Sequence, residues 1–358
     1  MPSDGYTQKG SPQSASRFTT TPHHLYVTNG GHLVFAFAIN ARSGVLTQVP
    51  KSPFRAGDKP IGLAIDPTGA FMYVANAFSN NVSAYVIRAK SGALTPVNGS
   101  PFAAGNSPRQ GAISPTGKSV YVVNDYSNNV SAYAINASTG ALTPVQGSPF
   151  AAGHTPIGLA IDPTGEFAYV ANIDNNDLSA YTINASSGAL TQLKDSPFAT
   201  GSEPWNVAIS GKFAYVTNFG SDNVSAYVIE TKSGRLTQVQ GSPFAAGINP
   251  EGIAIDPAAP FAYVTNLGSD NVSAYLINPE SGALTQVQGS PFAAGYNPTS
   301  VAVDPTGRFV YVANAGGGSR NVRGNVSAYT INASNGALTQ LRGSPFLAGY
   351  YPTRVAVR

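Results

Sequence analysis

The sequence contains no cysteine, one tryptophan and two methionines among 358 residues. The absence of cysteine excludes disulfides, thiolate metal sites and a cysteine nucleophile. Charged residues are also scarce, at 10% of the chain, and the formal net charge is +3. A charge this small over this length gives a weak electrostatic field, so the composition does not favour nucleic acid or an anionic membrane as a partner.

Long apolar segments are missing as well. Residues 1–21 are polar and lack the run of roughly 7–15 apolar residues found in a signal peptide, so we expect a flexible leader there. No other segment approaches the roughly 18 apolar residues of a membrane span. We expect residues 22–358 to form a single domain without such a span, and the low charge and abundance of Asn, Ser and Thr favour export to an extracellular or periplasmic location over the cytoplasm.

A proline-led motif, in its commonest form Pro-x-Gly-[Ile/Leu]-Ala-Ile-Asp-Pro, dominates what remains. It recurs seven times, and its first residue is Pro60, Pro108, Pro156, Pro204, Pro250, Pro298 and Pro352. The spacings are 48, 48, 48, 46, 48 and 54 residues. A nearly fixed period in this range is typical of propellers and solenoids.

Each period contains four short segments that are rich in β-branched and aromatic residues. In the first complete period these segments cover residues 62–66, 71–76, 81–87 and 94–102. Residues 66–69, Asp-Pro-Thr-Gly, suit a type I turn between the first two segments. Four β-strands per period are therefore expected.

The two ends of the chain complete one further unit. Six full periods run over residues 60–346, and residues 353–358 supply a first strand alone. Strands two, three and four of this last unit come from the N-terminal part, over residues 25–29, 32–39 and 46–54. Joining them pairs edges that would otherwise be exposed, whereas a solenoid would need polar capping repeats. The sequence thus predicts an all-β, seven-bladed β-propeller with four antiparallel strands per blade.

Three second strands carry the tetrapeptide Tyr-Val-Thr-Asn, at residues 26–29, 215–218 and 263–266. They resemble the YVTN repeats of bacterial and archaeal surface proteins. The repeat as a whole resembles the lactonase family of seven-bladed propellers, which includes 6-phosphogluconolactonases and the fungal enzyme acting on carboxymuconolactone. Residues 107–110, Ser-Pro-Arg-Gln, are similar to the family's Gly-Pro-Arg-His element at the mouth of the central channel, with Gln110 where the family often has histidine. The resemblance implies the fold, while the activity has to be argued from a site.

Residues that break the repeat are the best candidates for such a site, because the fold explains the residues that all blades share. The loops around the repeat proline are expected to meet at one mouth of the channel. Directly after the proline the seven units carry Ile61, Arg109, Ile157, Trp205, Glu251, Thr299 and Thr353. Residues that differ from the common Ile, Gly or small polar residues, at this position and at the other positions within two residues of the proline, include Arg109, Gln110, His154, Glu203, Trp205, Asn206, Glu251, Tyr296, Tyr350 and Arg354.

The first functional hypothesis is a lactonase-like hydrolase that opens a sugar or aryl lactone at this mouth. Arg109 and Arg354 would bind the anion and the oxyanion, and His154 or Glu251 would act as general base. Trp205 would stack on a substrate ring. The other substrate-binding candidates are Asn206, Glu203, Gln110, Tyr296 and Tyr350.

The second hypothesis is a noncatalytic binding or surface propeller that recognises a glycan or a protein partner, favoured by the YVTN-like repeats and the low charge. In either case we expect a monomer, a small-molecule lactone or carbohydrate ligand, and no cofactor. No metal site is expected, since His23 and His24 have no third ligand at metal spacing and the Asn-Asp pairs between strands are ordinary turn formers.

Overall fold

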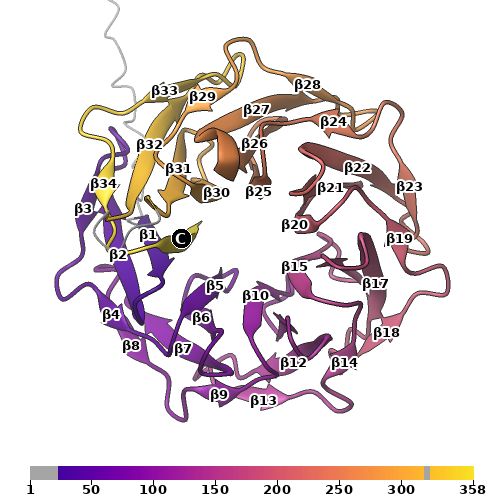
Figure 1. Cartoon of the computed structure of the whole chain (residues 1–358). Coiled ribbons are helices and arrows are strands. Elements are labelled where there is room, and N and C mark those ends of the chain that lie inside the picture. The colour runs from indigo at the N-terminus through magenta and orange to yellow at the C-terminus, as the bar shows by residue number, and fades with distance from the viewer. Residues whose placement is uncertain (1–22, 318–322) are drawn as a thin grey trace, which may run out of the picture.

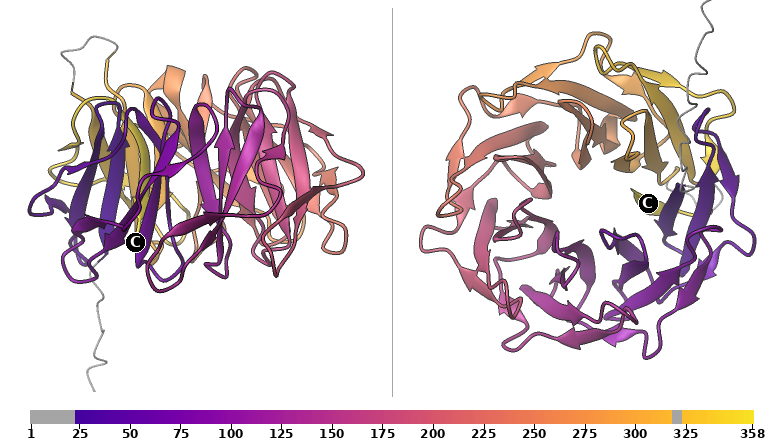
Figure 2. Two further views of the ribbon diagram at one scale, coloured as in Figure 1. Left: turned by 90° about the horizontal axis from the view of Figure 1, so that it is seen from below. Right: turned by 180° about the vertical axis from the view of Figure 1, so that it is seen from behind.

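The computed structural model describes residues 23–317 and 323–358, which form seven β-sheets arranged around a common axis (Figure 1). The strands run between two opposite faces of this ring, and the connecting turns emerge at those faces (Figure 2). The predicted all-β, seven-bladed propeller is confirmed. The leader expected over residues 1–21 lies outside the described residues.

Blade 1 combines both ends of the chain. Its strands are β1 (His24–Asn29), β2 (Leu33–Ile39), β3 (Leu46–Gln48), β4 (Phe54–Arg55) and β35 (Pro352–Val357). Blade 2 contains β5 (Pro60–Ile65), β6 (Phe71–Asn76), β7 (Asn81–Ile87), β8 (Leu94–Pro96) and β9 (Phe102–Ala103). Blade 3 contains β10 (Pro108–Ile113), β11 (Ser119–Asn124), β12 (Asn129–Ile135), β13 (Leu142–Pro144) and β14 (Phe150–Ala151).

The remaining four blades repeat this order. Blade 4 contains β15 (Pro156–Ile161), β16 (Phe167–Asn172), β17 (Asp177–Ile183), β18 (Leu190–Gln192) and β19 (Phe198–Ala199). Blade 5 contains β20 (Pro204–Ser210), β21 (Phe213–Asn218), β22 (Asn223–Ile229), β23 (Leu236–Gln238) and β24 (Phe244–Ala245). Blade 6 contains β25 (Pro250–Ile255), β26 (Phe261–Asn266), β27 (Asn271–Ile277), β28 (Leu284–Gln286) and β29 (Phe292–Ala293). Blade 7 contains β30 (Pro298–Val303), β31 (Phe309–Asn314), β32 (Asn325–Ile331), β33 (Leu338–Gln340) and β34 (Phe346–Leu347).

Blade 1 closes the ring as the sequence predicts. β35 pairs antiparallel with β1, with Leu25 opposite Val357 and Tyr26 opposite Ala356. In Figure 1 the yellow C-terminal strand accordingly lies beside the indigo β1. Strand one of this blade thus comes from the C-terminal end and the other strands come from the N-terminal part, so the edge of β1 pairs with the edge of β35.

The predicted fourth strand is two short strands rather than one. In blade 2, β8 pairs with residues 85–87 of β7 and β9 pairs with residues 81–82 of the same strand. Between them, Gly99 has a φ of 84° and Pro101 lacks a backbone N–H, so the chain leaves the ladder and returns to it. Each blade therefore has five strands, of which the last two continue one edge.

The second strand of every blade carries the tetrapeptide in the general form Tyr-Val-x-Asn, which is explained by contacts within and between blades. The hydroxyl of Tyr121 donates a hydrogen bond of 2.8 Å to the carbonyl oxygen of Gly188 in the next blade, and all seven blades repeat this bond. The side chain of Asn124 accepts from the Gly105 N–H at 3.1 Å and donates to Ser131 at 2.9 Å. The seven buried hydrophobic clusters each combine residues of two neighbouring blades. The tetrapeptide therefore belongs to the structure of the ring rather than to a binding site.

Helix is almost absent from the part of the chain that the structure describes. Its one helical element is the short 3-10 helix η1 (Leu267–Ser269), and no helix there has the length and apolar character needed to cross a membrane.

Candidate functional site

One face of the ring is built by the turns that lead into the innermost strands. In blade 3, Ser107 has a φ of 55°, and the register between β10 and β11 shifts directly after Pro108. All seven blades have this register shift after the repeat proline and a residue with positive φ before it. A β-bulge redirects the side chains beside it, so one repeated backbone feature sets the direction of the side chain that follows each proline.

A cavity of about 230 Å³ lies at this face. All seven residues that directly follow the repeat prolines line it: Ile61, Arg109, Ile157, Trp205, Glu251, Thr299 and Thr353. The other lining residues are Lys59, Gln110, Phe219, Leu267, Tyr351 and Arg354. The structure thus brings together five of the residues predicted from the sequence: Arg109, Gln110, Trp205, Glu251 and Arg354.

Glu251 is the buried acid of this cavity, with 9% of its surface exposed. Its backbone is fixed by the hydroxyl of Thr217, which donates to the Glu251 carbonyl oxygen at 2.8 Å. Burial raises the pKa of the Glu251 carboxyl to about 8, although Arg354, a hydrogen bond from the Trp205 side chain and Arg109 each lower it. A carboxyl with this pKa exists in both protonation states near neutral pH, which is what a general acid or base requires.

Arg354 and Gln110 form a bridge within the ring. Nη2 of Arg354 on β35 donates to Oε1 of Gln110 on β10 at 2.7 Å, so the bond reaches past β5. The close approach of β5 and β10 requires Gly62, because a Cβ there would overlap the carbonyl oxygen of Arg109. Since Gln110 is neutral, this bond orients Arg354 without compensating its positive charge, which acts on Glu251 and on any anion in the cavity.

Arg109 is held by an acidic residue that is absent from the residues predicted from the sequence. Its Nε and Nη2 lie 2.7 and 2.5 Å from Oδ2 of Asp125, and the side chains are 23% and 2% exposed. The other oxygen of Asp125, Oδ1, is buried and has no hydrogen-bond partner among the described residues. A buried carboxylate at this distance fixes the guanidinium of Arg109 in one orientation.

Asp125 also breaks the repeat, at a position outside the loop residues that flank the repeat proline. The residue after the tetrapeptide asparagine is Gly30, Ala77, Asp125, Ile173, Phe219, Leu267 and Ala315 in blades 1 to 7. Asp125 is the one charged residue in this series, and Phe219 and Leu267 of the same series line the cavity. Comparing this position across the blades would have identified Asp125.

The rest of the cavity is part apolar and part cationic. The rings of Trp205 and Phe219 stack with centroids 4.9 Å apart, and Leu267 extends this surface. Burial lowers the pKa of Lys59, as does the charge of Arg109, while Asp125 raises it. The cavity thus combines an acid, three cationic side chains and a flat apolar wall, which suits a ring-shaped ligand with an anionic group.

His154 and Glu203 do not belong to this cavity. His154 is exposed and lines a separate cavity of about 280 Å³, with Asn175, Asp177 and Gln192 among its other lining residues. It lies two residues before the repeat proline, outside the bulge that faces the cavity. Glu203 is also exposed, and its carbonyl oxygen accepts the N–H of Phe219 at 2.8 Å. The expected convergence of Arg109, His154, Glu203 and Glu251 is therefore limited to Arg109 and Glu251, and Glu251 is the one of the two candidate general bases that lines the cavity.

The remaining predicted residues also lie away from the lining. Asn206 is buried, and its Oδ1 accepts the N–H of Val207 at 2.9 Å. Tyr296 and Tyr350 are exposed on the rim around the cavity, by 68% and 52%. None of these three residues lines the cavity.

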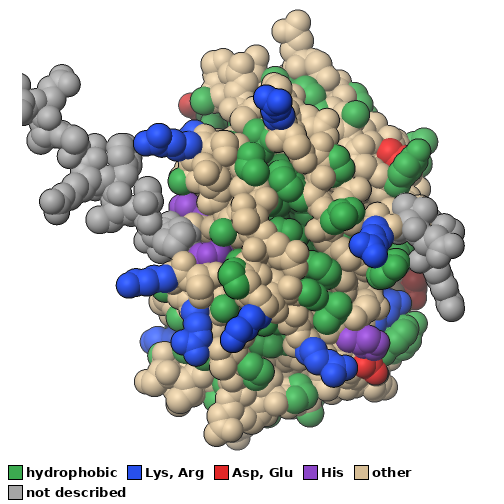
Figure 3. Space-filling model, turned by 90° about the vertical axis from the view of Figure 1, so that its left-hand side faces the viewer, with side chains coloured by type: hydrophobic (Ala, Val, Ile, Leu, Met, Phe, Trp, Pro, Cys, Tyr) green, Lys and Arg blue, Asp and Glu red, His purple; other side chains and the backbone are tan. Residues whose placement is uncertain are grey.

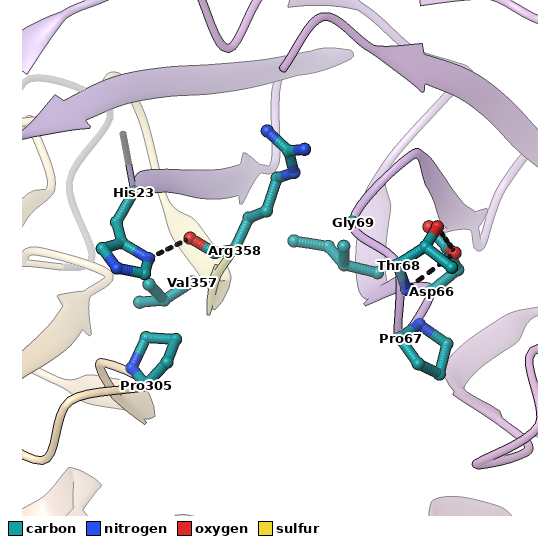
Figure 4. Close-up of a pocket in the computed structure, with 9 residues that line it drawn as sticks. His23, Asp66, Pro67, Thr68, Gly69, Pro305, Val357 and Arg358 are labelled. Carbon is teal, nitrogen blue, oxygen red and sulfur yellow. Dashed lines mark hydrogen bonds between the residues drawn. The ribbon is translucent and has the colours of Figure 1, made fainter. Parts of the chain in front are cut away.

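A second cavity, of about 360 Å³, lies at the opposite ends of the innermost strands (Figure 4). Its acid, Asp66, is engaged by its own turn, because Oδ2 accepts the N–H of Thr68 at 3.0 Å and Oδ1 accepts the N–H of Phe71 at 2.6 Å. Asp162 and Asp304 make the same contacts in their blades. These acids accept hydrogen bonds that stabilise the repeat turns, so the Glu251 cavity is the better candidate for a functional site.

Among the described residues, no group of three or more His, Asp or Glu side chains is placed to hold a metal ion.

A sequence model of the family described as "Lactonase, 7-bladed beta-propeller" matches residues 1–104, 101–154 and 197–294. These ranges cover well over half of the chain, and the protein therefore belongs to this lactonase family. The resemblance inferred from the sequence is confirmed at the level of the family.

Individual relatives agree with this assignment. A 6-phosphogluconolactonase from Formosa agariphila is 41% identical over 61 residues, which cover 16% of this chain and 17% of that protein. The solved structure of a candidate 6-phosphogluconolactonase from Bacteroides uniformis has a TM-score of 0.81 at 18% identity and covers 95% of this chain and 100% of its own. The periplasmic gluconolactonase of Pseudomonas aeruginosa has a TM-score of 0.78 at 20% identity and covers 94% of this chain and 98% of its own. At these identities the structural likeness establishes a shared fold.

Proposed function

We propose that this protein is a hydrolase that opens a sugar or aryl lactone in the cavity around Glu251. Membership of the lactonase family supports such an activity in general. The observation that carries the proposal for this cavity is Glu251 itself, a buried carboxyl with a pKa of about 8 that shares the cavity with Arg109 and Arg354.

A lactone is a cyclic ester, and its hydrolysis needs a base for water and a site for the developing oxyanion. The Glu251 carboxylate accepts a proton from water while the water oxygen bonds to the carbonyl carbon. Arg354 and Arg109 stabilise the negative charge on the former carbonyl oxygen. The bond to the ring oxygen then breaks, and protonated Glu251 returns its proton to the leaving oxygen, which gives a hydroxy acid.

The cavity lining supports a substrate with one ring. Trp205 and Phe219 offer a flat surface to a sugar or aryl ring. Lys59 and Arg109 line the same cavity, and since Asp125 compensates the charge of Arg109, it is Lys59 that suits a substrate with an anionic substituent. The names of the relatives, gluconolactonase and 6-phosphogluconolactonase, agree with a sugar lactone, with or without a phosphate.

Acid release from three lactones tests the proposal: glucono-δ-lactone, its 6-phosphate and dihydrocoumarin, each corrected for spontaneous hydrolysis. We expect turnover of at least one lactone and a loss of about 100-fold or more in Glu251→Gln, which is within the range for removal of a general base. Glu203→Gln is the matched control, because it makes the same change at an exposed carboxyl on the same face, and it should keep wild-type activity. Full activity of Glu251→Gln, or no hydrolysis of any of the three lactones, would contradict the proposal. The alternative, a noncatalytic binding propeller, predicts no turnover of any of the three lactones in this experiment.

A further inference from the structure

The face that carries the Glu251 cavity also carries most of the large hydrophobic side chains exposed in the described residues. Six of these nine side chains lie at its rim: Phe78, Tyr126, Ile248, Tyr296, Tyr350 and Tyr351. Their exposed fractions range from 52% for Tyr350 and Tyr351 to 74% for Tyr126. We call these six residues the rim arc.

The rim arc is fixed by the repeat. Phe78 and Tyr126 are the second residues after the tetrapeptide asparagine, while Ile248, Tyr296 and Tyr350 lie two residues before the repeat proline. Backbone hydrogen bonds join these two positions, such as Phe78 N–H to Asp58 at 3.1 Å and Gly316 N–H to Tyr296 at 3.0 Å. Each side chain therefore projects from a hydrogen-bonded turn.

The repeat does not require hydrophobic residues at the rim. The rim arc covers blades 6, 7, 1, 2 and 3, whereas blade 4 has His154 and Asp174 at the two positions and blade 5 has Ser202 and Gly220. On the side wall shown in Figure 3, hydrophobic side chains lie in small groups between polar and cationic ones. Large hydrophobic side chains exposed on one face of a protein indicate a surface that binds a partner or ligand.

The rim arc is continuous with the cavity. Tyr351 lines the cavity and is 52% exposed, and Lys59, which also lines it, has its Nζ 4.5 Å from the centroid of the Phe78 ring. At about 230 Å³ the cavity is smaller than the roughly 300–1,000 Å³ of sites for drug-sized ligands. A ligand that uses both the cavity and the rim arc is therefore extended, with one unit inside and further units outside.

The charges at the centre of this surface favour a carbohydrate over a protein. They belong to Lys59, Arg109, Asp125, Glu251 and Arg354. The cores of protein interfaces are depleted in charged residues, because a flat partner would remove these groups from water. A sugar chain instead places the C–H faces of its rings against aromatic side chains, while its hydroxyl groups stay hydrated and bond to tyrosine hydroxyls.

We propose that the rim arc binds an oligosaccharide whose terminal unit, a sugar acid or its lactone, enters the Glu251 cavity. The identity of this terminal unit rests on the proposed function, whereas binding along the rim arc does not. The two are measured separately, since Tyr126 and Tyr296, the rim-arc residues changed below, do not line the cavity that holds a single-ring lactone.

Aldonic acids of increasing length are suitable probes: gluconate, cellobionate and cellotetraonate, with maltobionate and maltotetraonate as a series of different linkage. Calorimetry gives their affinities, and the fluorescence of Trp205, the one tryptophan of the chain, reports entry into the cavity. We expect the tetrameric acid of at least one series to bind ten times more tightly than gluconate or better. The double variant Tyr126→Ser and Tyr296→Ser should lose this gain while keeping the affinity for gluconate.

The control is the double variant Val86→Ser and Leu276→Ser, which changes two exposed hydrophobic residues on the strands β7 and β27. It should keep the dependence on chain length. Equal affinities for gluconate and both tetrameric acids would overturn the proposal and leave the rim arc as a contact for a protein. A gain in affinity with sugar-chain length that persists in the double variant Tyr126→Ser and Tyr296→Ser would also overturn the proposal. A gain in affinity with sugar-chain length but without lactone turnover would support binding along the rim arc and contradict the proposed function. Lactone turnover without such a gain would support the proposed function and contradict binding along the rim arc.

Discussion

Glu251→Gln provides the sharpest test of the candidate site, because it removes one ionisation and nearly preserves the shape of the side chain. Burial raises the pKa of Glu251 from 4.5 to about 8, which corresponds to about 5 kcal/mol in favour of the protonated form. The charged groups around the carboxyl are Arg354, Arg109, Lys59 and Asp125. With this pKa, about a tenth of Glu251 is ionised at pH 7 and about nine-tenths at pH 9.

Trp205 makes this ionisation visible without any assumption about the reaction. Its side chain hydrogen-bonds to Glu251, and it is the one tryptophan in the sequence. A fluorescence titration of the wild type between pH 5 and 10 should therefore show a midpoint near 8 that is missing in Glu251→Gln. If Glu251 is the general base, kcat/KM rises with the same midpoint, and its value at pH 7 is about a tenth of the plateau.

The same group affects stability in a defined direction. Because its pKa is higher in the folded than in the unfolded protein, the contribution of Glu251 is fully present below pH 4.5 and is lost as the pH rises through 8. Urea unfolding should show the wild type losing up to about 5 kcal/mol relative to Glu251→Gln between pH 4.5 and 9. A fluorescence midpoint below pH 6, or an identical midpoint in the variant, would refute this account of Glu251.

Four further predictions concern the residues around the site and the ring. Asp125→Asn should leave the charge of Arg109 less compensated and so lower the pKa of Glu251, seen as an acidic shift of the Trp205 fluorescence midpoint; an unchanged midpoint would argue against coupling through Arg109. Tyr121→Phe should cost about 1 kcal/mol in urea unfolding through the lost bond to Gly188, whereas Tyr126→Phe, at an exposed residue, should cost nothing. Burial raises the pKa of Tyr181 and Tyr275 to about 12, so stability is present below pH 10 and should be lost above it, as measured by circular dichroism together with phenolate absorbance. Gly62→Ala should lower both activity and stability because a Cβ overlaps the backbone of Arg109, while Gly31→Ala, whose nearest contact is 3.7 Å away, should be tolerated.

The blades and their closure are predictable from the sequence because local and global signals agree. The period, the turn residues and the alternating β-branched and aromatic residues all indicate the same four-segment unit, and the two chain ends carry complementary parts of it. The split of the fourth segment is different. Residues 94–102 contain turn-forming residues, Asn98-Gly99 and Pro101, that mark a break within the segment, and the positive φ of Gly99 takes the chain out of the ladder there.

The site was predictable in part, and the geometry explains which part. The comparison of the residues after the repeat prolines selected Arg109, Trp205 and Glu251, and all seven residues at that position line the cavity because a bulge redirects each of them. No sequence pattern states this direction, so the sequence does not distinguish the residues two positions before the proline, such as His154 and Tyr296, from those that line the cavity, although neither of them lines it.

Asp125 completes the same reasoning from a different position. It stands in a series where the other six blades have glycine or an apolar residue, and the backbone hydrogen bond from its N–H to Ser107 at 3.0 Å brings it to the turn that precedes Arg109. A break in the repeat is therefore informative where a repeated backbone contact places it beside the axis. Asp125 and Arg109 both meet this condition and contact each other. A substitution of either one should therefore disturb the other more than it disturbs any residue of the rim arc.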